Sequence, residues 1–426
     1  MKVKIVSRKL IKPGTPTPQN LRTYKISSMD ELNPTMYVIG ILYYSSSPNI
    51  GHLENSLAQI LPQFYPFAGR YIKEDHLVNC SDQGAEFVEA EVDCDLLEIT
   101  GSGAERGELN DLLPLEVGAA DQLTDPILSV QITKFECGGT AIGTCISHRL
   151  IDACSLGTFL SAWSKASLGD KGEPIIPNFD FPLYFPAENL GILDFGIERT
   201  RDTKHVSKKI LFDKKAIATL RDGVSHLFKN NERPASRVLV VTAFLMEALL
   251  RSDRAKHGQP RPFIMAQAVN IRERTIPPLS KYSIGNLVSL ATLDYSADES
   301  KSMDYERFVT LLADSVKKAV SDCTKIFSNR EDGHKIMVDF MVSTSEKTLD
   351  SSINGIWFTD WSKFSFYEAD FGFGKPIWTS TANIPIKNHV TLLNTKENDG
   401  IEAWVNLHEE DMVYFERDEE IMKLTT

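Results

Sequence analysis

The stretch that decides the fold runs from Gly138 to Asp152 and reads GGTAIGTCISHRLID. Small and β-branched residues from Thr140 to Ile146 predict a strand, and the glycine pair before them predicts a turn after the alternating run Leu128–Phe135. We therefore expect two antiparallel strands joined by a tight turn. His148 would lie at the end of the second strand, and Asp152 would open a helix. A histidine fixed at a strand end suits general-base catalysis, because its ordinary pKa lies near neutrality.

The spacing of His148 and Asp152 is not specific by itself. A histidine and an acid four residues apart arise often by chance in a chain with 9 histidines and 58 acidic residues. The alternative interpretation is therefore an incidental histidine without a chemical role. The strand before His148 and the helix after it favour the catalytic interpretation.

Composition bounds the class of protein. A chain of 426 residues is long enough for two sizeable domains, and 42% hydrophobic with 24% charged residues is ordinary for a globular protein. The formal net charge of −12, without a cluster of lysines and arginines, argues against a nucleic-acid partner.

The cysteines and the apolar runs indicate whether the protein has a metal site, spans a membrane or is secreted. The 6 cysteines include no Cys-x-x-Cys pair and no metal-ligand spacing. The first residues contain no apolar stretch of signal-peptide length, and no apolar run is long enough for a membrane span. We therefore expect a cytoplasmic protein with no metal site and no membrane partner.

Helical and strand-like patterns alternate irregularly along the chain. They show no βαβ repeat, which predicts an α/β fold with large mixed sheets rather than a doubly wound nucleotide fold. Four prolines between Glu173 and Leu190 mark an extended crossing segment. The predicted domains are therefore residues 1–172, with the His148 motif, and 209–426, with a second motif around Asp370, joined by a linker over 173–208.

The second motif runs from Asp370 to Gly374 and reads DFGFG. Its two glycines predict backbone conformations or close approaches that a Cβ would block, and the aspartate can bind the amides of such a turn. The alternative is a structural loop without contact to substrate. A kinase is excluded, because no Gly-rich loop and no His-Arg-Asp catalytic loop accompany the motif.

Two arginines follow a predicted strand in the segment 267–274, which reads QAVNIRER. Arg272 or Arg274 could pair with Asp152, because a carboxylate buried at a helix start needs a partner. A solvated basic loop is the alternative, and it fits Arg274 better than Arg272.

Taken together, the HRLID and DFGFG motifs resemble those of the plant BAHD acyl-CoA-dependent acyltransferases. The residues around Phe135–Gly143 are most similar to the branch that acetylates alkaloids. Further matches occur in the order typical of the family: Pro16-Thr17-Pro18, Tyr65–Arg70, Asp82-Gln83-Gly84, Gln267–Arg272 and Gly285-Asn286.

The resemblance implies two domains similar to chloramphenicol acetyltransferase, a crossover loop and an active-site channel at their interface. It implies that His148 is the sole general base and that no acyl-enzyme forms. Asp152 would orient the site through Arg272. Asp370 would be a catalytic candidate, although the chemistry of its loop favours a scaffold near the co-substrate. Ser236 and Arg237 would contact the co-substrate.

The resemblance also implies the substrates. Acetyl-CoA would be the co-substrate, with no permanently bound cofactor, and the acceptor would be a hydroxyl of a plant specialised metabolite, an alkaloid. The protein would act as a monomer. Malonyl-CoA as donor, and a non-catalytic relative that binds a small molecule or a partner, remain the alternatives.

Three positions depart from related patterns. Phe373 replaces the usual tryptophan of the DFGFG motif, and Met246 stands where many relatives have tryptophan. Ser147 precedes His148, whereas the condensation domains of peptide synthetases have a second histidine there, which disfavours that related family.

Overall fold

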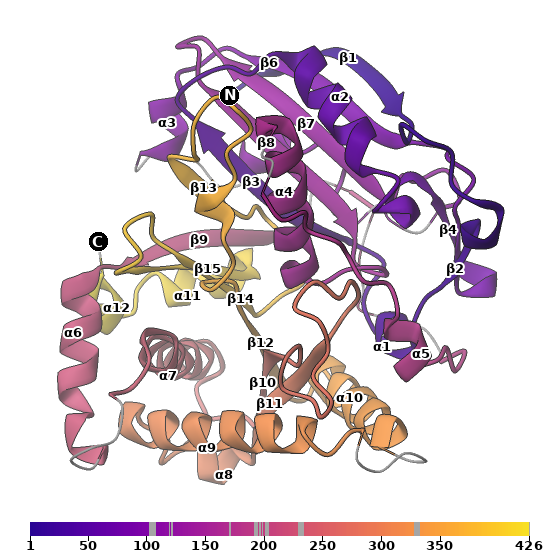
Figure 1. Ribbon diagram of the computed structural model, residues 1–426. Coiled ribbons are helices and arrows are strands. Elements are labelled where there is room, and N and C mark those ends of the chain that lie inside the picture. The colour runs from indigo at the N-terminus through magenta and orange to yellow at the C-terminus, as the bar shows by residue number, and fades with distance from the viewer. Residues whose placement is uncertain are drawn as a thin grey trace. The chain divides into compact units, whose positions relative to one another are not determined.

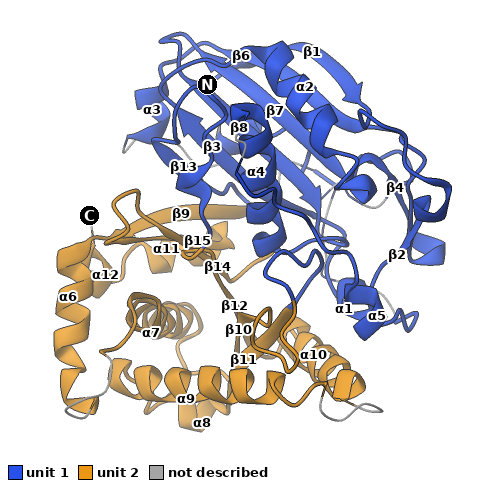
Figure 2. Cartoon of the chain, in the orientation of Figure 1, with its two compact units in different colours: residues 1–203, 280–287, 364–385 blue, residues 204–279, 288–363, 386–426 orange. Residues whose placement is uncertain are grey.

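The computed structural model describes residues 1–101, 108–118, 120, 122–169, 172–190, 195, 197, 199–200, 204–228, 234–327 and 333–425. They form two compact units (Figure 2). Unit 1 comprises residues 1–203, 280–287 and 364–385, and unit 2 comprises residues 204–279, 288–363 and 386–426. Each unit contains a six-stranded mixed sheet with helices. The prediction of an α/β fold with two domains and mixed sheets is confirmed.

The units are not continuous in sequence, which differs from the predicted domain boundaries. The segments 280–287 and 364–385 pack with unit 1, so the DFGFG loop lies there and not with the C-terminal part. The reason is strand pairing: β13 (Trp378–Ser380) adds antiparallel to the edge strand β3 (Tyr37–Tyr44). Within the predicted linker, residues 191–194, 196, 198 and 201–203 lie outside the described residues.

The large sheet of unit 1 contains the predicted hairpin. Its strand order is β1 (Val3–Ile11), β6 (Ala85–Val92), β7 (Leu128–Phe135), β8 (Thr140–Ser147), β3 and β13. Only β6 and β7 are parallel; the other pairs are antiparallel. Gly138 has φ 82° in the turn between β7 and β8, a conformation that glycine adopts without strain. Strands β3 and β8 are buried at every position.

Two helices lie side by side across one face of this sheet, α2 (Ile50–Ile60) and α4 (Ala153–Leu168) (Figure 1). Asp152 caps the start of α4 by accepting from the amide of Ser155, and Gly169 ends the helix in the left-handed conformation. The predicted helix after Asp152 is confirmed. The remaining elements of unit 1 are β2 (Thr23–Lys25), α1 (Ser28–Glu31), β4 (Arg70–Ile72), β5 (Leu77–Asn79), α3 (Leu96–Thr100) and α5 (Phe181–Tyr184).

The sheet of unit 2 has the order β11 (Val288–Tyr295), β10 (Phe263–Asn270), β12 (Asn354–Asp360), β14 (His389–Asn394), β15 (Ile401–His408) and β9 (His205–Phe212). Strand β12 is parallel to both β10 and β14, and the other pairs are antiparallel. The helices are α6 (Lys214–Gly223), α7 (Arg237–His257), α8 (Ala297–Ser300), α9 (Tyr305–Cys323), α10 (Gly333–Leu349), α11 (Glu409–Phe415) and α12 (Glu419–Leu424).

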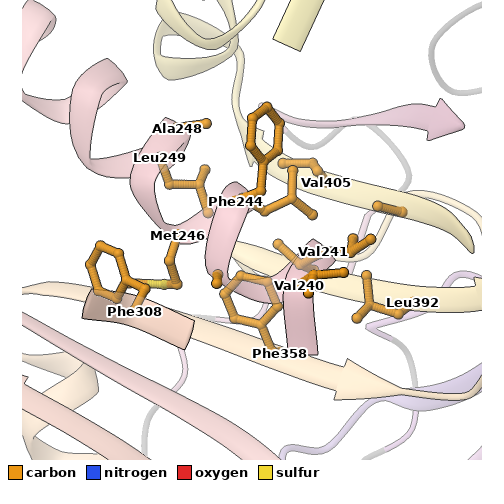
Figure 3. Packing of buried hydrophobic residues seen from close by; sticks show 14 of the residues in the cluster. Val240, Val241, Phe244, Met246, Ala248, Leu249, Phe308, Phe358, Leu392 and Val405 are labelled. Atoms are coloured by element: carbon orange, nitrogen blue, oxygen red, sulfur yellow. The ribbon is translucent and has the colours of Figure 1, made fainter. Parts of the chain in front are cut away.

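The core of unit 2 forms between α7 and its sheet. Phe244 and its neighbours on α7 pack against residues such as Phe358 and Val405 of the strands (Figure 3). Met246 is fully buried beside Phe308 of α9 (Figure 3). A methionine therefore fills this position in the core with a flexible apolar side chain, and the place needs no indole donor.

We predict that Gly143→Ala destabilises unit 1, because a Cβ at this position of β8 would lie 2.1 Å from the carbonyl oxygen of Leu112. The expected loss is about 1–3 kcal/mol in the free energy of unfolding, measured by urea denaturation. Gly157→Ala is the control: its Cβ would lie 3.5 Å from Phe364, and alanine favours a helix. Equal stability of Gly143→Ala and wild type would contradict the packing at β8.

Candidate functional site

His148 follows the last residue of β8, where two other segments fix its backbone. The amide of Ser147 donates to the carbonyl of Ile127 at 2.9 Å, and the amide of His148 donates to the carbonyl of Met36 at 2.8 Å. Since β8 is buried between two neighbouring strands, the backbone has little freedom there. The side chain of His148 is half-buried. The predicted position of His148 at the end of the strand is confirmed.

The surroundings of His148 favour an uncharged imidazole. Burial lowers its pKa below the ordinary value of 6.5, and the nearby positive charge of Arg149 acts in the same direction. Three groups raise the pKa but do not reverse its lowering: the backbone carbonyl of His148, the carboxylate of Asp152 and the side chain of Asn286. The ring is therefore a free base at neutral pH, as proton abstraction requires.

Asp152 joins the start of α4 to the segment 285–287. Its Oδ1 accepts from the amide and the hydroxyl of Ser155, both at 2.9 Å, and its Oδ2 accepts from the amide of Leu287 at 3.2 Å. The amide of Asp152 donates to the carbonyl of Gly285 at 3.3 Å. The carboxylate thus brings a segment from more than 130 positions away in the chain to the end of β8.

Two further residues belong to this site that the sequence did not identify as functional. The Nδ2 of Asn286 donates to the carbonyl of His148 at 2.8 Å and to Oδ1 of Asp30 at 2.8 Å. Asp30 and Asn286 are both fully buried. The only sequence signal for Asp30 is the spacing Ser27-x-x-Asp30, which is typical of a helix start and does form a capping box at α1.

The DFGFG loop is a turn organised by Asp370. Its Oδ1 accepts from the amides of Gly372 at 2.8 Å and Gly374 at 3.1 Å, and both glycines have positive φ. The ring of Phe373 lies 4.7 Å from that of Tyr44, so aromatic packing is retained where the family has tryptophan. All these contacts lie within unit 1.

The structure does not bring Asp370 to His148. The hydroxyl of Tyr44 donates to the carbonyl of Ala369, so the loop lies at the Tyr44 end of β3. Tyr44 is opposite Thr140, the first residue of β8, whereas His148 follows the last. At about 3.3 Å per residue, the length of β8 separates the two ends by roughly 23 Å.

The residues predicted to contact the co-substrate lie in unit 2, and both side chains have partners there. The hydroxyl of Ser236 accepts from the amide of Leu239 and caps α7. The guanidinium of Arg237 donates to the carbonyl of Asn398 at 2.6 Å and to its Oδ1 at 2.8 Å.

Arg272 also lies in unit 2, where it is buried and its Nη1 donates to Oδ1 of Asn270 at 3.2 Å. Its predicted pairing with Asp152 would join the two units and stays a prediction. Within the described ranges, no group of three or more histidine, cysteine or acidic side chains is placed to bind a metal ion. None of the helices in those ranges combines the length and the apolar character that a membrane span requires.

The pKa of His148 can be measured directly. We predict that its imidazole titrates below 6.5 in an NMR titration of protein with ¹⁵N-labelled histidine, because burial disfavours the charged ring. The His148→Gln variant assigns the signal among the 9 histidines. A midpoint at or above 6.5 would contradict the electrostatics described.

Two substitutions of Asp370 distinguish a structural role of its carboxylate from a role in proton transfer. Asp370→Ala removes the acceptor of two backbone bonds and should lower the free energy of unfolding by roughly 1–2 kcal/mol in urea denaturation. Asp370→Asn retains an oxygen acceptor and should keep most of the stability and the turnover. Loss of turnover in a stable Asp370→Asn protein would instead support a catalytic carboxylate.

Comparison with known proteins identifies the family. The model of the Transferase family matches residues 1–422. A pelargonidin glucoside malonyltransferase from Salvia splendens is 40% identical over 428 residues, which cover 99% of both chains. Vinorine synthase from Rauvolfia serpentina is 35% identical over 420 residues (96% of this chain, 94% of the relative). Stemmadenine O-acetyltransferase from Catharanthus roseus is 34% identical over 425 residues (96% and 95%).

The fold agrees with the sequence comparison. The crystal structure of vinorine synthase matches with a TM-score of 0.82 at 34% identity and covers 100% of this chain and 98% of that structure. The family model and these relatives, which are 34–40% identical over nearly the whole chain, agree with each other. The chain therefore belongs to the Transferase family, the BAHD acyltransferases.

Proposed function

We propose that the protein is an acyl-CoA-dependent O-acyltransferase in which His148 is the general base. The observation that carries the proposal is the state of His148: a half-buried imidazole, fixed at the end of β8, whose lowered pKa leaves it uncharged at neutral pH. The membership of the family and the names of the relatives support acyl transfer as the reaction.

The proposed reaction is a direct transfer. The imidazole takes the proton from the acceptor hydroxyl while the oxygen attacks the carbonyl carbon of the thioester. The tetrahedral intermediate then breaks its carbon–sulfur bond, and the thiolate of CoA leaves and receives the proton from the imidazolium. The histidine is thereby returned to its free-base form, and the products are the ester and free CoA.

The neighbours of His148 support the absence of an acyl-enzyme. Cys145 is fully buried within β8, and the hydroxyl of Ser147 is enclosed without a hydrogen-bond partner among the described residues. Nδ1 of His148 has no hydrogen-bond partner among the described residues, so no thiol or hydroxyl there is bound to this nitrogen, as activation of a nucleophile through it would require.

The other predicted residues receive proposed roles that follow from their contacts. Asp152 positions the chain around His148, because its carboxylate binds the start of α4 and the amide of Leu287. For Asp370 we favour a scaffold role over the predicted catalytic one, since its carboxylate binds its own loop. Arg272 as partner of Asp152, and Ser236 and Arg237 as contacts of the CoA, remain proposals.

We propose acetyl-CoA as the donor and a hydroxyl of a plant specialised metabolite, an alkaloid, as the acceptor. Vinorine synthase and stemmadenine O-acetyltransferase support this choice by their sequence similarity. The malonyltransferase at 40% identity supports malonyl-CoA as the second candidate. We also propose that the protein works in the cytoplasm as a monomer.

The first test replaces the base. We predict that His148→Ala lowers the transfer rate by roughly 10²–10⁴-fold while the fold survives, measured as release of free CoA thiol with acetyl-CoA and hydroxylated alkaloids. His52→Ala is the control, because His52 is a histidine of α2 that bonds the backbone carbonyl of Ser167. Turnover retained by His148→Ala would refute the general base. Binding of CoA without turnover by the wild type would instead favour a non-catalytic relative.

The second test identifies the donor. Acetyl-CoA and malonyl-CoA compete in one reaction, and mass spectrometry of the ester gives the ratio of the two kcat/KM values. We predict that the acetyl ester predominates. A predominant malonyl ester would assign the chain to the activity of its Salvia splendens relative.

A further inference from the structure

The amide of Asn286 has only one orientation that its surroundings allow. Its nitrogen lies 2.8 Å from the carbonyl oxygen of His148 and 2.8 Å from Oδ1 of Asp30. Both partners are acceptors, so the atom facing them must be Nδ2, which has two hydrogens to donate. The backbone amide of Asn286 donates to the same oxygen of Asp30 at 2.9 Å. Residue 286 is therefore fixed at both its backbone and its side chain.

The carboxylate that fixes Asn286 is buried and ionisable. Oδ2 of Asp30 accepts from the amide and the hydroxyl of Ser27, at 2.9 and 2.7 Å, and Oδ1 accepts the two bonds from Asn286. Burial raises the pKa of Asp30 to about 6, and the four donors act against this shift. At neutral pH the carboxylate is thus charged, and hydrogen bonds to a charged acceptor are roughly twice as strong as neutral ones.

Beside these hydrogen bonds lie a ring nitrogen that can donate and an amide oxygen that can accept. Nδ1 of His148 and Oδ1 of Asn286 are both enclosed, and neither has a hydrogen-bond partner among the described residues. A buried polar atom without a partner is unfavourable, so a hydrogen bond between the two atoms would stabilise both. The side chain of Asn286 already favours the protonated form of the ring, which is the effect of an acceptor near an imidazole N–H.

We propose that Asp30 and Asn286 are positioning residues that hold the proton of the neutral His148 ring on Nδ1 and leave Nε2 free as the base. Asp30 fixes the amide of Asn286, whose nitrogen supports the carbonyl of His148 and whose oxygen is the acceptor offered to Nδ1. This inference rests on the proposed function, in which His148 is the general base. The tautomer itself can be tested without any substrate.

Other charged groups also act on His148 and Asp30 and contribute to their pKa values. Asp152 on α4 and Arg149 act on His148 with opposite signs. Asp30 interacts electrostatically with Arg149, with Tyr24 of β2 and with Tyr71 of β4. The backbone carbonyl of His148 also favours the protonated ring, and more strongly than the side chain of Asn286 does, but it already accepts from Nδ2 of Asn286 at 2.8 Å. Oδ1 of Asn286 is the enclosed acceptor that has no other partner among the described residues, and we therefore assign it to Nδ1 of the ring.

The first experiment observes the tautomer by NMR. Protein labelled with ¹⁵N-histidine is measured above the titration range, and the two-bond ¹⁵N–¹H correlations of His148 are assigned with His148→Gln. We expect the proton on Nδ1 in the wild type and a mixture of tautomers in Asn286→Ala. A proton on Nε2 in the wild type, or an unchanged tautomer in Asn286→Ala, would overturn the proposal.

The second experiment measures kinetics. Asn286→Ala should lower kcat by roughly 10-fold or more with little change in KM, since the partners of a functional histidine act on the ring and not on substrate binding. Removing an acceptor also lowers the pKa of His148, so the acid limb of the kcat/KM profile should move to lower pH. Asp30→Asn should reduce kcat in the same direction.

Ser56→Ala is the matched control, because it removes a buried hydroxyl between α2 and α4 that makes two hydrogen bonds. It should lose stability and keep both kcat and the acid limb. If Asn286→Ala behaves like Ser56→Ala, the proposal is overturned. If Asn286→Ala is unstable, Asn286→Ser replaces it in the same measurements.

The two proposals can fail separately. A wild type without transfer activity, but with the Nδ1 proton lost in Asn286→Ala, would refute the proposed function and support the positioning role. An active wild type with the proton on Nε2 would do the opposite.

Discussion

The site depends on one buried carboxylate at the start of a helix. Asp152 caps α4 and at the same time binds the amide of Leu287, which places the segment 285–287 against the end of β8. This bond holds Leu287, the residue next to Asn286, and so helps to keep Asn286 beside His148. Because a carboxylate accepts several strong hydrogen bonds, one side chain can orient a helix and a distant segment together.

A second buried carboxylate completes the arrangement. Asp30 binds Asn286 and Asp152 binds Leu287, so two acids hold consecutive residues of this segment. Both acids are satisfied by N–H and O–H donors of the chain, which offsets part of the free-energy cost of burying charge. Burial also lowers the pKa of His148.

How much of this could be predicted depends on the range of the interactions. Local sequence patterns predicted three features that depend on residues close in sequence: the hairpin of β7 and β8, the cap at Asp152 and the helix α4. Asp30 and Asn286 are 256 positions apart, and neither carries a local signal for its partner. The continuous domain boundaries failed for the same reason, since β13 pairs with β3 across more than 330 positions.

The central claim is direct transfer by a histidine base, and it has a direct measurement. Wild-type protein is incubated with acetyl-CoA in the absence of acceptor, and its intact mass is recorded by mass spectrometry. The account predicts an unmodified mass, because His148 abstracts a proton and no side chain accepts the acyl group. An acyl adduct that forms on His148 or a cysteine and disappears when acceptor is added would contradict it.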